Sequence, residues 1–500
     1  MRAAHFLPAV LVLIVAVNCG TAVPRYVNGI DYPLTRNGAQ QAIDECENGT
    51  VCDLVNIEGD IESDGITLML KNGVDVDWHH HRLKMMPTDK SYINIAMAGI
   101  LVDELFLSND AERGSFTLNI SGLSNATNLV APYVVGDFIL LREKGDGRQF
   151  ISIIADIDLS TNSVTLIDSV ADPFLVSNGA WIVHNPQVIR QGGLYNFVCD
   201  ANGNNGNLSI CLEFRPGAIH YVVENIQVTG SFGPRNKAGI QGLWFHRLYA
   251  SRVLGVTASG FATSTSDYND IQFHGLGGGT TVDHLVSLNA NGFGPGFAHC
   301  QRITVSGVQV THAGSRGFLI DRTTLSTFNG IVITDGTTSP ATANQKGSGL
   351  CLRFGSHNNT ISNVIVFNGD DFAIRFDGSQ CKHGFDCDSF NTVTNVQLKR
   401  HRAKPGLPSY SIVNGRNCTG NTVEGSWDGL VQDWNKDFKF TNSRGPFVEQ
   451  SISRTCPTAD DFTGKWNVRT CIRCMPFDNV LKDCCFGLDG YVRCFETVLF

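Results

Sequence analysis

The sequence lacks an apolar run long enough to cross a membrane, and it lacks an excess of basic residues. The apolar stretch from Val10 to Val17 is shorter than the roughly 20 residues that a membrane-spanning helix needs, and no later stretch reaches that length. Lysine and arginine number 38 against 47 aspartate and glutamate residues, which gives a formal net charge of −9. We therefore expect neither a membrane nor a nucleic acid as a partner.

Residues 1–22 have the features of a secretory signal peptide. Met1-Arg2 precedes the short apolar stretch, and Gly20-Thr21-Ala22 supplies the small residues of a cleavage site. N-glycosylation sequons follow along the chain, and an intracellular protein has no use for so many. They lie at Asn48, Asn119, Asn125, Asn207, Asn358 and Asn417. The sequence therefore predicts a secreted, extracellular glycoprotein.

The chain contains 16 cysteines, and the loss of Cys19 with the signal peptide leaves an odd number. Cys300, Cys351 and Cys418 are the candidates for an unpaired thiol. Close spacing predicts three local disulfides in an oxidising compartment. These pairs are Cys46/Cys52, Cys199/Cys211 and Cys381/Cys387. Six more cysteines predict a disulfide-rich module at the carboxyl end. They are Cys456, Cys471, Cys474, Cys484, Cys485 and Cys494. Zinc binding by Cys471 and Cys474 is less favoured, because thiols of secreted chains are normally oxidised.

A repeated pattern between residues 242 and 377 predicts the fold. Its segments have a large apolar second residue and a mostly apolar fourth one, the period of two that marks a strand with one buried face. The segments are Gly-Leu-Trp-Phe-His-Arg at 242–247, Asp-Ile-Gln-Phe-His-Gly at 270–275, Gly-Phe-Ala-His-Cys-Gln at 296–301, Gly-Phe-Leu-Ile-Asp-Arg at 317–322, Gly-Leu-Cys-Leu-Arg-Phe at 349–354 and Asp-Phe-Ala-Ile-Arg-Phe at 371–376.

A second series of apolar residues runs in step with these segments at spacings of 22 to 33 residues. We expect one interior file from it, formed by Ile226, Leu254, Val286, Val308, Ile331, Val364 and Val396. Strands that recur at such periods, with glycine and asparagine but no helix between them, indicate stacked coils. The predicted fold class is all-β, a parallel β-helix.

The rest of the chain divides around this solenoid. A helix over 37–46 with Asn37 as its N-cap would close the first coil. Alternating segments between about 108 and 190 suggest a small inserted antiparallel unit. The predicted division is a signal peptide over 1–22, a cap and first rungs over 23–107, the inserted β unit over 108–190, the β-helix over 191–450 and the disulfide-rich module over 451–500.

The period of two also predicts a column of polar residues on the outside of the solenoid. If Phe245, Phe273, His299, Ile320, Leu352 and Ile374 face the core, the next residue on each rung faces solvent. The resulting column is His246, His274, Cys300, Asp321, Arg353 and Arg375. Successive rungs lie about 4.8 Å apart, so that neighbouring members reach the same ligand.

The chain resembles the pectin lyase-like superfamily of right-handed parallel β-helices over about 190–400, mainly in its rung pattern. The resemblance implies a polysaccharide-cleaving or epimerising protein. Asn368-Gly369-Asp370-Asp371 is similar to the Gly-Asp-Asp motif of polygalacturonases, whose other motifs are missing: Gly347-Ser348-Gly349 stands in place of Asn-Thr-Asp. Asp370 and Asp371 are accordingly expected to bind substrate, together with Trp244 and Gln272 on the histidine-bearing strands.

The column favours the elimination or epimerisation of a uronic acid, which removes a proton next to a carboxylate. The predicted catalytic residues are His246, His274, Asp321, Arg353 and Arg375. Arg353 and Arg375 offer forks that hold a carboxylate. A second positive charge is unfavourable so close to His246, which keeps His274 neutral as a base. The predicted partner is thus an acidic polysaccharide.

Two other functions stay open, a polygalacturonase-like glycoside hydrolase and a non-enzymatic matrix or carbohydrate-binding protein. Hydrolysis needs two carboxyl groups, and Asp321 and Asp371 lie two rungs apart, near the upper limit of the distance for inversion. No cofactor is required by these alternatives. A Ca²⁺ ion at Asp370 and Asp371 is an alternative in which paired carboxylates hold a hard cation.

Overall fold

A computed structural model describes the chain from residue 23 onward, with gaps. The described ranges are 23–46, 52–62, 68–84, 95–97, 102–125, 132–144, 147–185, 188–200, 210–214, 217–230, 241–260, 269–290, 292–335, 348–367, 372–378, 388–399, 410–415, 417–428, 430–433, 438–444, 448–450, 470–474, 480–486 and 492–498. The predicted signal peptide lies outside them. No helix within these ranges is long and apolar enough to cross a membrane.

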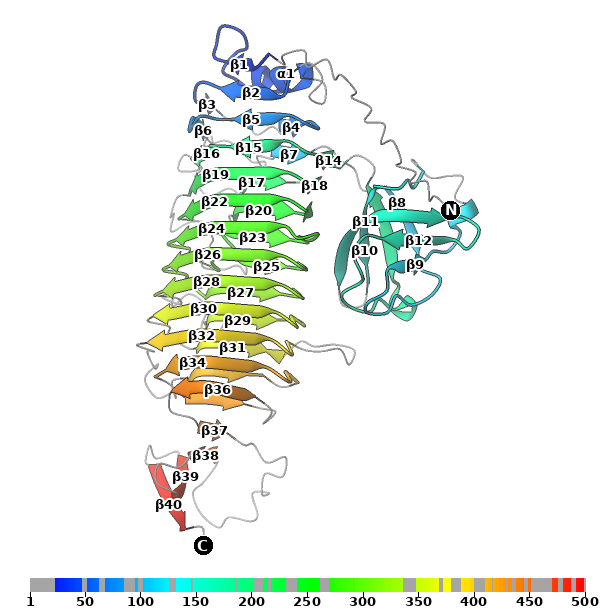
Figure 1. Ribbon diagram of the computed structural model, residues 1–500. Coiled ribbons are helices and arrows are strands. Elements are labelled where there is room, and N and C mark those ends of the chain that lie inside the picture. Colours follow the sequence, from blue (N-terminus) through cyan, green and yellow to red (C-terminus); the bar gives the residue numbers. More distant parts are fainter. Residues whose placement is uncertain are drawn as a thin grey trace, which may run out of the picture.

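The chain winds into a stack of coils in which parallel strands form long sheets (Figure 1). This confirms the predicted all-β class and the parallel β-helix. The longest sheet, the outer sheet A, contains β1 (Arg25–Val27), β2 (Leu54–Ile57), β5 (Asp75–Asp77), β15 (Gly193–Tyr195), β19 (Val222–Thr229), β22 (Arg252–Ser259), β24 (Thr281–Leu288), β26 (Thr304–Thr311), β28 (Thr327–Thr334), β30 (Thr360–Phe367), β32 (Thr392–Lys399), β34 (Thr422–Trp427) and β36 (Lys439–Arg444), with β3 (Ile61–Glu62), β6 (Arg82–Lys84) and β16 (Val198–Asp200) beside them.

A second sheet, the site sheet, closes the coils on another side. Its nine strands are β17 (Ile210–Phe214), β20 (Gln241–His246), β23 (Ile271–His274), β25 (Gly296–Ala298), β27 (Arg316–Asp321), β29 (Ser348–Arg353), β31 (Phe372–Asp377), β33 (Tyr410–Asn414) and β35 (Leu430–Asp433). Short strands lie at the corner between the two sheets or near the first coils. They are β14 (Ile189–Arg190), β18 (Ala218–Ile219) and β21 (Leu248–Tyr249), and the pair β4 (Leu68–Leu70) and β7 (Ile95–Met97).

In the eight-residue strands of sheet A, the alternation of inward-facing and outward-facing side chains is interrupted at the fourth residue. That residue has a positive φ, for example 67° at Gly255, 56° at His284 and 65° at Gly307, a region that glycine and asparagine tolerate best. Because of the break, the second, fifth and seventh residues face the interior rather than every other residue. In β26 these are Val305, Val308 and Val310.

The interior file differs from the predicted one at two places. Strand pairing aligns Ile226 with Val256, and Val256 with Leu285. Leu254 and Val286 were therefore assigned wrongly, because the breaks at Gly255 and His284 change which neighbouring residues face inward. The opposite interior wall contains stacked rings of Phe214, Phe245, Phe273 and Phe297, with centroids 5.1, 4.9 and 4.6 Å apart. These files form one continuous apolar core.

A ladder of buried asparagines closes the turns that lead into sheet A. Asn391 Oδ1 accepts hydrogen bonds from the backbone and side-chain nitrogens of Asn359 at 3.1 and 3.0 Å. Its Nδ2 donates to Ser356 O at 2.9 Å and to Asn421 Oδ1 at 3.1 Å. The three asparagines are almost completely buried. The ladder thus satisfies turn backbone groups that water does not reach.

Asn391→Ala is expected to destabilise the protein by about 3 kcal/mol, because it leaves buried donors and acceptors of Asn359 and Ser356 without partners. Calorimetric melting of the full chain measures this change. Asn329→Ala is the matched control, since exposed Asn329 accepts bonds from Ser362 and Asn363 that water can replace. Equal melting temperatures for the two variants would contradict a structural role for the ladder.

An antiparallel sheet interrupts the solenoid between its first and later coils and lies beside the stack (Figure 1). It contains β8 (Val102–Phe106), β13 (Trp181–Asn185), β10 (Phe138–Arg142), β11 (Gln149–Asp158), β12 (Ser163–Leu166) and β9 (Thr117–Asn119), with short 3-10 helices at Leu123–Asn125 and Val176–Asn178. One face covers a core of its own, and the other packs on Ile219 and Tyr249 of the solenoid corner. We call this unit the inserted domain.

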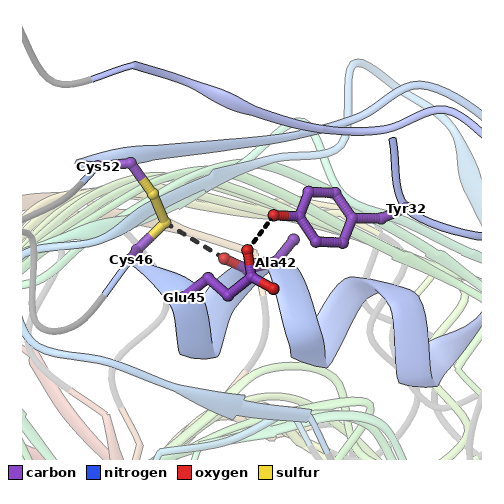
Figure 2. The surroundings of a disulfide bond; sticks show 5 residues. All are labelled: Tyr32, Ala42, Glu45, Cys46 and Cys52. Atoms are coloured by element: carbon purple, nitrogen blue, oxygen red, sulfur yellow. Dashed lines mark hydrogen bonds between the residues drawn. A yellow bond between two sulfur atoms is a disulfide. The ribbon is translucent and has the colours of Figure 1, made fainter. Parts of the chain in front are cut away.

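Helix α1 (Arg36–Glu45) packs Ala39, Ala42 and Ile43 against the first coil. Its N-cap is Thr35, whose side chain accepts a hydrogen bond from Gly38 N at 3.2 Å, so the expected cap at Asn37 was wrong. The predicted Cys46–Cys52 disulfide follows the helix, as Figure 2 shows. In the same figure the hydroxyl of Tyr32 donates a hydrogen bond to Glu45 and fastens the preceding loop to the helix.

The other cysteine and glycan predictions are tested only in part. Cys300, Cys351 and Cys418 are buried and form no disulfide, as predicted. Cys199 is disulfide-bonded, and the side chain of its predicted partner Cys211 lies outside the described residues. So do Cys381 and Cys387 and the side chains of the six carboxyl-terminal cysteines, although the backbone there forms the antiparallel strands β37 (Val448–Gln450), β38 (Thr470–Cys474), β39 (Val480–Phe486) and β40 (Val492–Val498).

Three of the sequon asparagines have described side chains. Asn417 is exposed, Asn119 is partly buried, and partly buried Asn358 donates its amide to His357 Nδ1 at 2.8 Å. The side chains of Asn48, Asn125 and Asn207 lie outside the described residues. Glycosylation remains a prediction at all six positions.

Candidate functional site

Strand pairing places several predicted catalytic residues in one file on the outside of the site sheet. The pairs connect His246 with His274, then Ala298, then Asp321 and Arg353. Arg353 pairs in turn with Asp377. We call this row of six residues the site file. Its members follow one another at rungs about 4.8 Å apart.

Two predicted members of the column occupy other places. Cys300 belongs to the interior, because strand β25 ends at Ala298 and His299 turns the chain with a φ of 56°. Arg375 pairs with Cys351 and so lies in the neighbouring file, while Asp377 takes the place expected for it. The alternation of side chains predicted correctly the face to which Arg375 points. The predicted register was wrong by two residues, because Arg353 pairs with Asp377 and not with Arg375.

The neighbouring file contains the predicted substrate-binding residues Trp244 and Gln272, which pair with each other. Trp244 packs on His246 with ring centroids 4.2 Å apart, and Gln272 Nε2 donates to the backbone oxygen of Phe273. Both side chains are partly buried. Asp370 and Asp371 lie outside the described residues, and the alternative of a Ca²⁺ ion there is untested.

Histidines at the amino-terminal end of the site file form a stack. His246 and His274 are 5.5 Å apart between ring centroids, and His274 and His299 are 4.9 Å apart. His299 was expected to face the core, but the turn at this residue brings its ring into the stack. Glu213, on the next strand, has a carboxylate oxygen 3.5 Å from His246 Nε2.

Burial makes two of these histidines neutral. Burial, and then the neighbouring His246, lowers the pKa of His274 to about 3. Burial also lowers the pKa of His299 well below its ordinary value, and His274 adds to the effect. The expected neutral state of His274 therefore agrees with its surroundings. A base with so low a pKa accepts a proton poorly near neutral pH, however, which weakens the case for His274 as the base.

Arginines surround the carboxylate of Asp321. Arg353 Nε donates to Asp321 Oδ2 at 2.9 Å, and Arg322 Nη1 lies 3.5 Å from Oδ1. Asp321 is only 6% exposed. Burial raises the pKa of Asp321, and the charges of Arg353, Arg322 and Arg316 partly counteract this. Because Arg353 is committed to Asp321, its predicted role of holding a substrate carboxylate is less favoured than one of orienting Asp321.

Arg316 offers a cation that the sequence pattern did not reveal. Its guanidinium stacks 4.6 Å over the ring of Phe293, which packs with Leu319 and Cys351 on the outer side of the sheet. Arg353 approaches the same ring at 5.8 Å. Arg316 Nε and Nη1 are buried and have no hydrogen-bond partner among the residues that the structure describes. A carboxylate can bind this guanidinium without breaking an ion pair to a described residue, but Nε and Nη1 become accessible to it only when the side chain moves.

The inserted domain forms a second wall of the site. A cleft lies between it and the solenoid, lined by Arg148, Gln149, Asp172, His299, Arg322, Phe354, Gly355 and His357. His357 Nε2 is 2.5 Å from Asp172 Oδ1 and Arg302 Nη2 donates to Ser169 Oγ at 2.7 Å, so polar contacts join the walls. Within the described ranges, no group of three or more histidine, cysteine or acidic side chains is placed to hold a metal ion.

Comparisons with known proteins find similar solved structures but no family for this chain. No protein-family model and no curated protein matches the chain. Among solved structures, the chain is similar to the gp49 tailspike of Pseudomonas phage LKA1, with 13% identity, a TM-score of 0.42 and coverage of 82% of this chain and 72% of that one. The Streptococcus pneumoniae surface adhesin PfbA has 12% identity, a TM-score of 0.43 and coverage of 86% and 99%.

A third similar structure is the Gp54 tailspike of Acinetobacter baumannii bacteriophage AP22, which was solved in complex with a capsular saccharide. It has 11% identity and a TM-score of 0.38, with coverage of 82% of this chain and 77% of that one. At these identities and scores the similarities carry no argument about this chain. The function of this chain has to be argued from its own residues.

Proposed function

We propose that this protein is an extracellular enzyme that acts on an acidic polysaccharide by removing a proton next to a uronate carboxylate, as a lyase or an epimerase. The observation that carries the proposal is the guanidinium of Arg316, which acts electrostatically on Asp321 and whose Nε and Nη1 have no hydrogen-bond partner among the described residues. A cation is needed to neutralise the substrate carboxylate, and a base is needed at the adjacent carbon.

Asp321 is the residue best suited to be the base. Burial raises its pKa, which makes the carboxylate a stronger proton acceptor than an exposed one. Arg353 holds it through Oδ2 and so orients it. Arg316 then binds the substrate carboxylate and stabilises the negative charge that develops when the proton leaves. The neutral His274 and the ring of Trp244 provide an uncharged surface for the neighbouring sugars.

The positive side chains of this region support an acidic substrate. Arg316, Arg322, Arg353 and Arg375 lie on or beside the site file, and Arg148 lines the cleft opposite them. These arginines outnumber Asp321 and Asp377, with which three of them pair, although the chain as a whole carries a net charge of −9. Such a local field attracts an anionic polymer to the groove.

A second candidate is inverting glycoside hydrolysis by Asp321 and Asp377. These residues lie two rungs apart in the site file, about 9.6 Å at a rung spacing of about 4.8 Å. Inverting enzymes separate their carboxyl groups by about 6.5–9.5 Å. The raised pKa of Asp321 suits a general acid, and Asp377, which pairs with Arg375 Nη2 at 3.0 Å, supplies the second carboxyl group.

Incubation with pectate, alginate, glucuronan and glycosaminoglycans tests the proposal. Elimination produces unsaturated ends that absorb in the ultraviolet, whereas hydrolysis produces reducing ends without this absorbance. Epimerisation leaves the chain intact and incorporates solvent deuterium, which mass spectrometry detects. If every polymer stays unchanged and unlabelled, the proposed chemistry is refuted for these substrates.

Two substitutions separate the two chemistries. Arg316→Gln is expected to lower the rate of elimination or deuterium incorporation by about 10²–10³, because a preorganised charge is lost. Asp377→Asn leaves that rate nearly unchanged but abolishes hydrolysis. Arg252→Gln, an exposed position on sheet A, is the matched control. Full activity of Arg316→Gln on the proposed substrate would refute the role of this arginine.

A further inference from the structure

The inserted domain presents a row of aromatic and cationic side chains at the edge of the site. Strand pairing aligns Phe106 with Trp181, Trp181 with Arg142, and Arg142 with Gln149. Directly paired residues point to the same face of a sheet, so all four side chains share one face. Trp181 belongs to the cluster that packs on the solenoid, so this is the face toward the solenoid. We call these four residues, together with Lys144, the inserted row.

The two ends of the inserted row have different surroundings. Trp181 is 7% exposed, whereas Phe106 beside it is 48% exposed. The cationic groups lie over these rings. Lys144 Nζ is 5.6 Å from the centroids of both Phe106 and Trp181, and the Arg142 guanidinium is 5.2 Å from that of Trp181. The row therefore combines a half-exposed aromatic ring with two cationic groups.

The inserted row is continuous with the site on the solenoid. The charge of Arg142 contributes to the low pKa values of His274 and His299, so its guanidinium lies within electrostatic reach of the histidine stack. Gln149, the next residue of the row, lines the cleft together with His299 and Arg322. The cleft thus links Gln149 of the inserted row with residues that lie next to the site file.

We propose that the inserted row is a binding subsite for a uronate unit of the polysaccharide, a few sugars away from Asp321; this rests on the proposed function. The flat face of the sugar stacks on Phe106, which supplies apolar area at low conformational cost. The carboxylate of the same unit accepts hydrogen bonds from Lys144, and Arg142 adds a second cation at the border with the histidine stack. A neutral sugar would leave both cations without a counter-charge.

Affinity for oligosaccharides of defined length tests this subsite. The probes are hexasaccharides and disaccharides prepared from the polymer on which the wild-type protein acts or, if it cleaves none, from pectate, alginate and heparosan. The full-length protein is titrated calorimetrically. Phe106→Ala and Lys144→Gln are each expected to weaken hexasaccharide binding by about fivefold to tenfold. Neither change affects the affinity for disaccharides bound at Asp321, because these do not reach the row.

Phe116→Ala is the matched control, since Phe116 is 51% exposed on the same domain but lies outside the inserted row. Unchanged hexasaccharide affinity in Phe106→Ala and Lys144→Gln would overturn the subsite while leaving the proposed function intact. Equal weakening in the Phe116 variant would overturn it as well, because the effect would then belong to the domain in general. If the wild-type protein prefers neutral hexasaccharides, the proposed function itself fails.

Discussion

Asp321→Asn is expected to lower kcat/KM on the acidic polysaccharide by about 10²–10⁴, the largest loss of any substitution at the site. Asparagine has nearly the same shape and can still accept the bond from Arg353 Nε, but its amide cannot accept the proton. In the proposed elimination the carboxyl group of Asp321 acts as the base, and in the alternative hydrolysis it acts as the acid. The measurement is turnover of the substrate found in the screen.

The melting temperature shows whether the loss is one of chemistry. We expect it to change little in Asp321→Asn, because the acceptor for Arg353 remains. Asp283→Asn on the outer face of sheet A removes the same charge far from the site file and should keep full activity. If Asp321→Asn retains more than about a tenth of the activity, Asp321 is only a structural partner of Arg353.

The fold could be predicted from the sequence because every coil has to meet the same packing requirement. A rung must place apolar residues inside at a period of two, and stacking repeats this at 22 to 33 residues. The positions of Leu254 and Val286 were missed because the positive φ at the fourth strand residue changes which side chains face inward. Glycine reveals that break at Gly255 and Gly307, but His284 adopts it without any signal in the sequence.

The site residues whose position follows from the side-chain alternation of their own strand could be predicted from the sequence. His246, His274, Asp321 and Arg353 share a file because each follows a core residue on its strand. Arg375 was placed two residues off, since loop length does not define where strand β31 begins to pair.

The other participants depend on contacts that no local pattern reports. His299 joins the stack through a left-handed turn, and Arg316 reaches the site by lying on Phe293. Arg142 comes from the inserted domain and precedes His246, the first residue of the site file, by more than a hundred residues. Its position follows from the packing of that domain on Tyr249 and Ile219, a tertiary contact between elements that do not repeat.

A buried acid inside the solenoid is expected to make the stability of the protein depend strongly on pH. Asp270 precedes strand β23 and is 1% exposed. It accepts hydrogen bonds from Ser287 Oγ and from the backbone nitrogen of Ile271, and no arginine or lysine pairs with it in the part of the chain that the structure describes. Burial raises the pKa of Asp270 to about 7 from an ordinary value of 3.8.

The direction of the effect follows from the two pKa values. Below about pH 4 the carboxyl group is protonated in both the folded and the unfolded chain, and the group adds no penalty. Between about pH 4 and pH 7 the unfolded chain releases the proton while the folded chain retains it, so the free energy of unfolding falls as the pH rises. The loss is complete above pH 7 and amounts to about 4 kcal/mol, at about 1.4 kcal/mol for each pH unit of difference.

Asp270→Asn removes this titration and keeps the shape of the side chain. Its amide can donate to Ser287 Oγ, and its oxygen can still accept from Ile271 N. We therefore expect the variant to resemble the wild-type protein in melting temperature near pH 4 and to exceed it clearly at pH 8. Calorimetric scans across this range measure the difference. Asp283→Asn is the control, because Ser306 lowers the pKa of the partly exposed Asp283 and its stability contribution is lost on acidification instead. Curves for the wild-type and Asp270→Asn proteins that stay parallel from pH 4 to pH 8 would mean that Asp270 is ionised in the folded chain, with water or a cation reaching the interior of the coil.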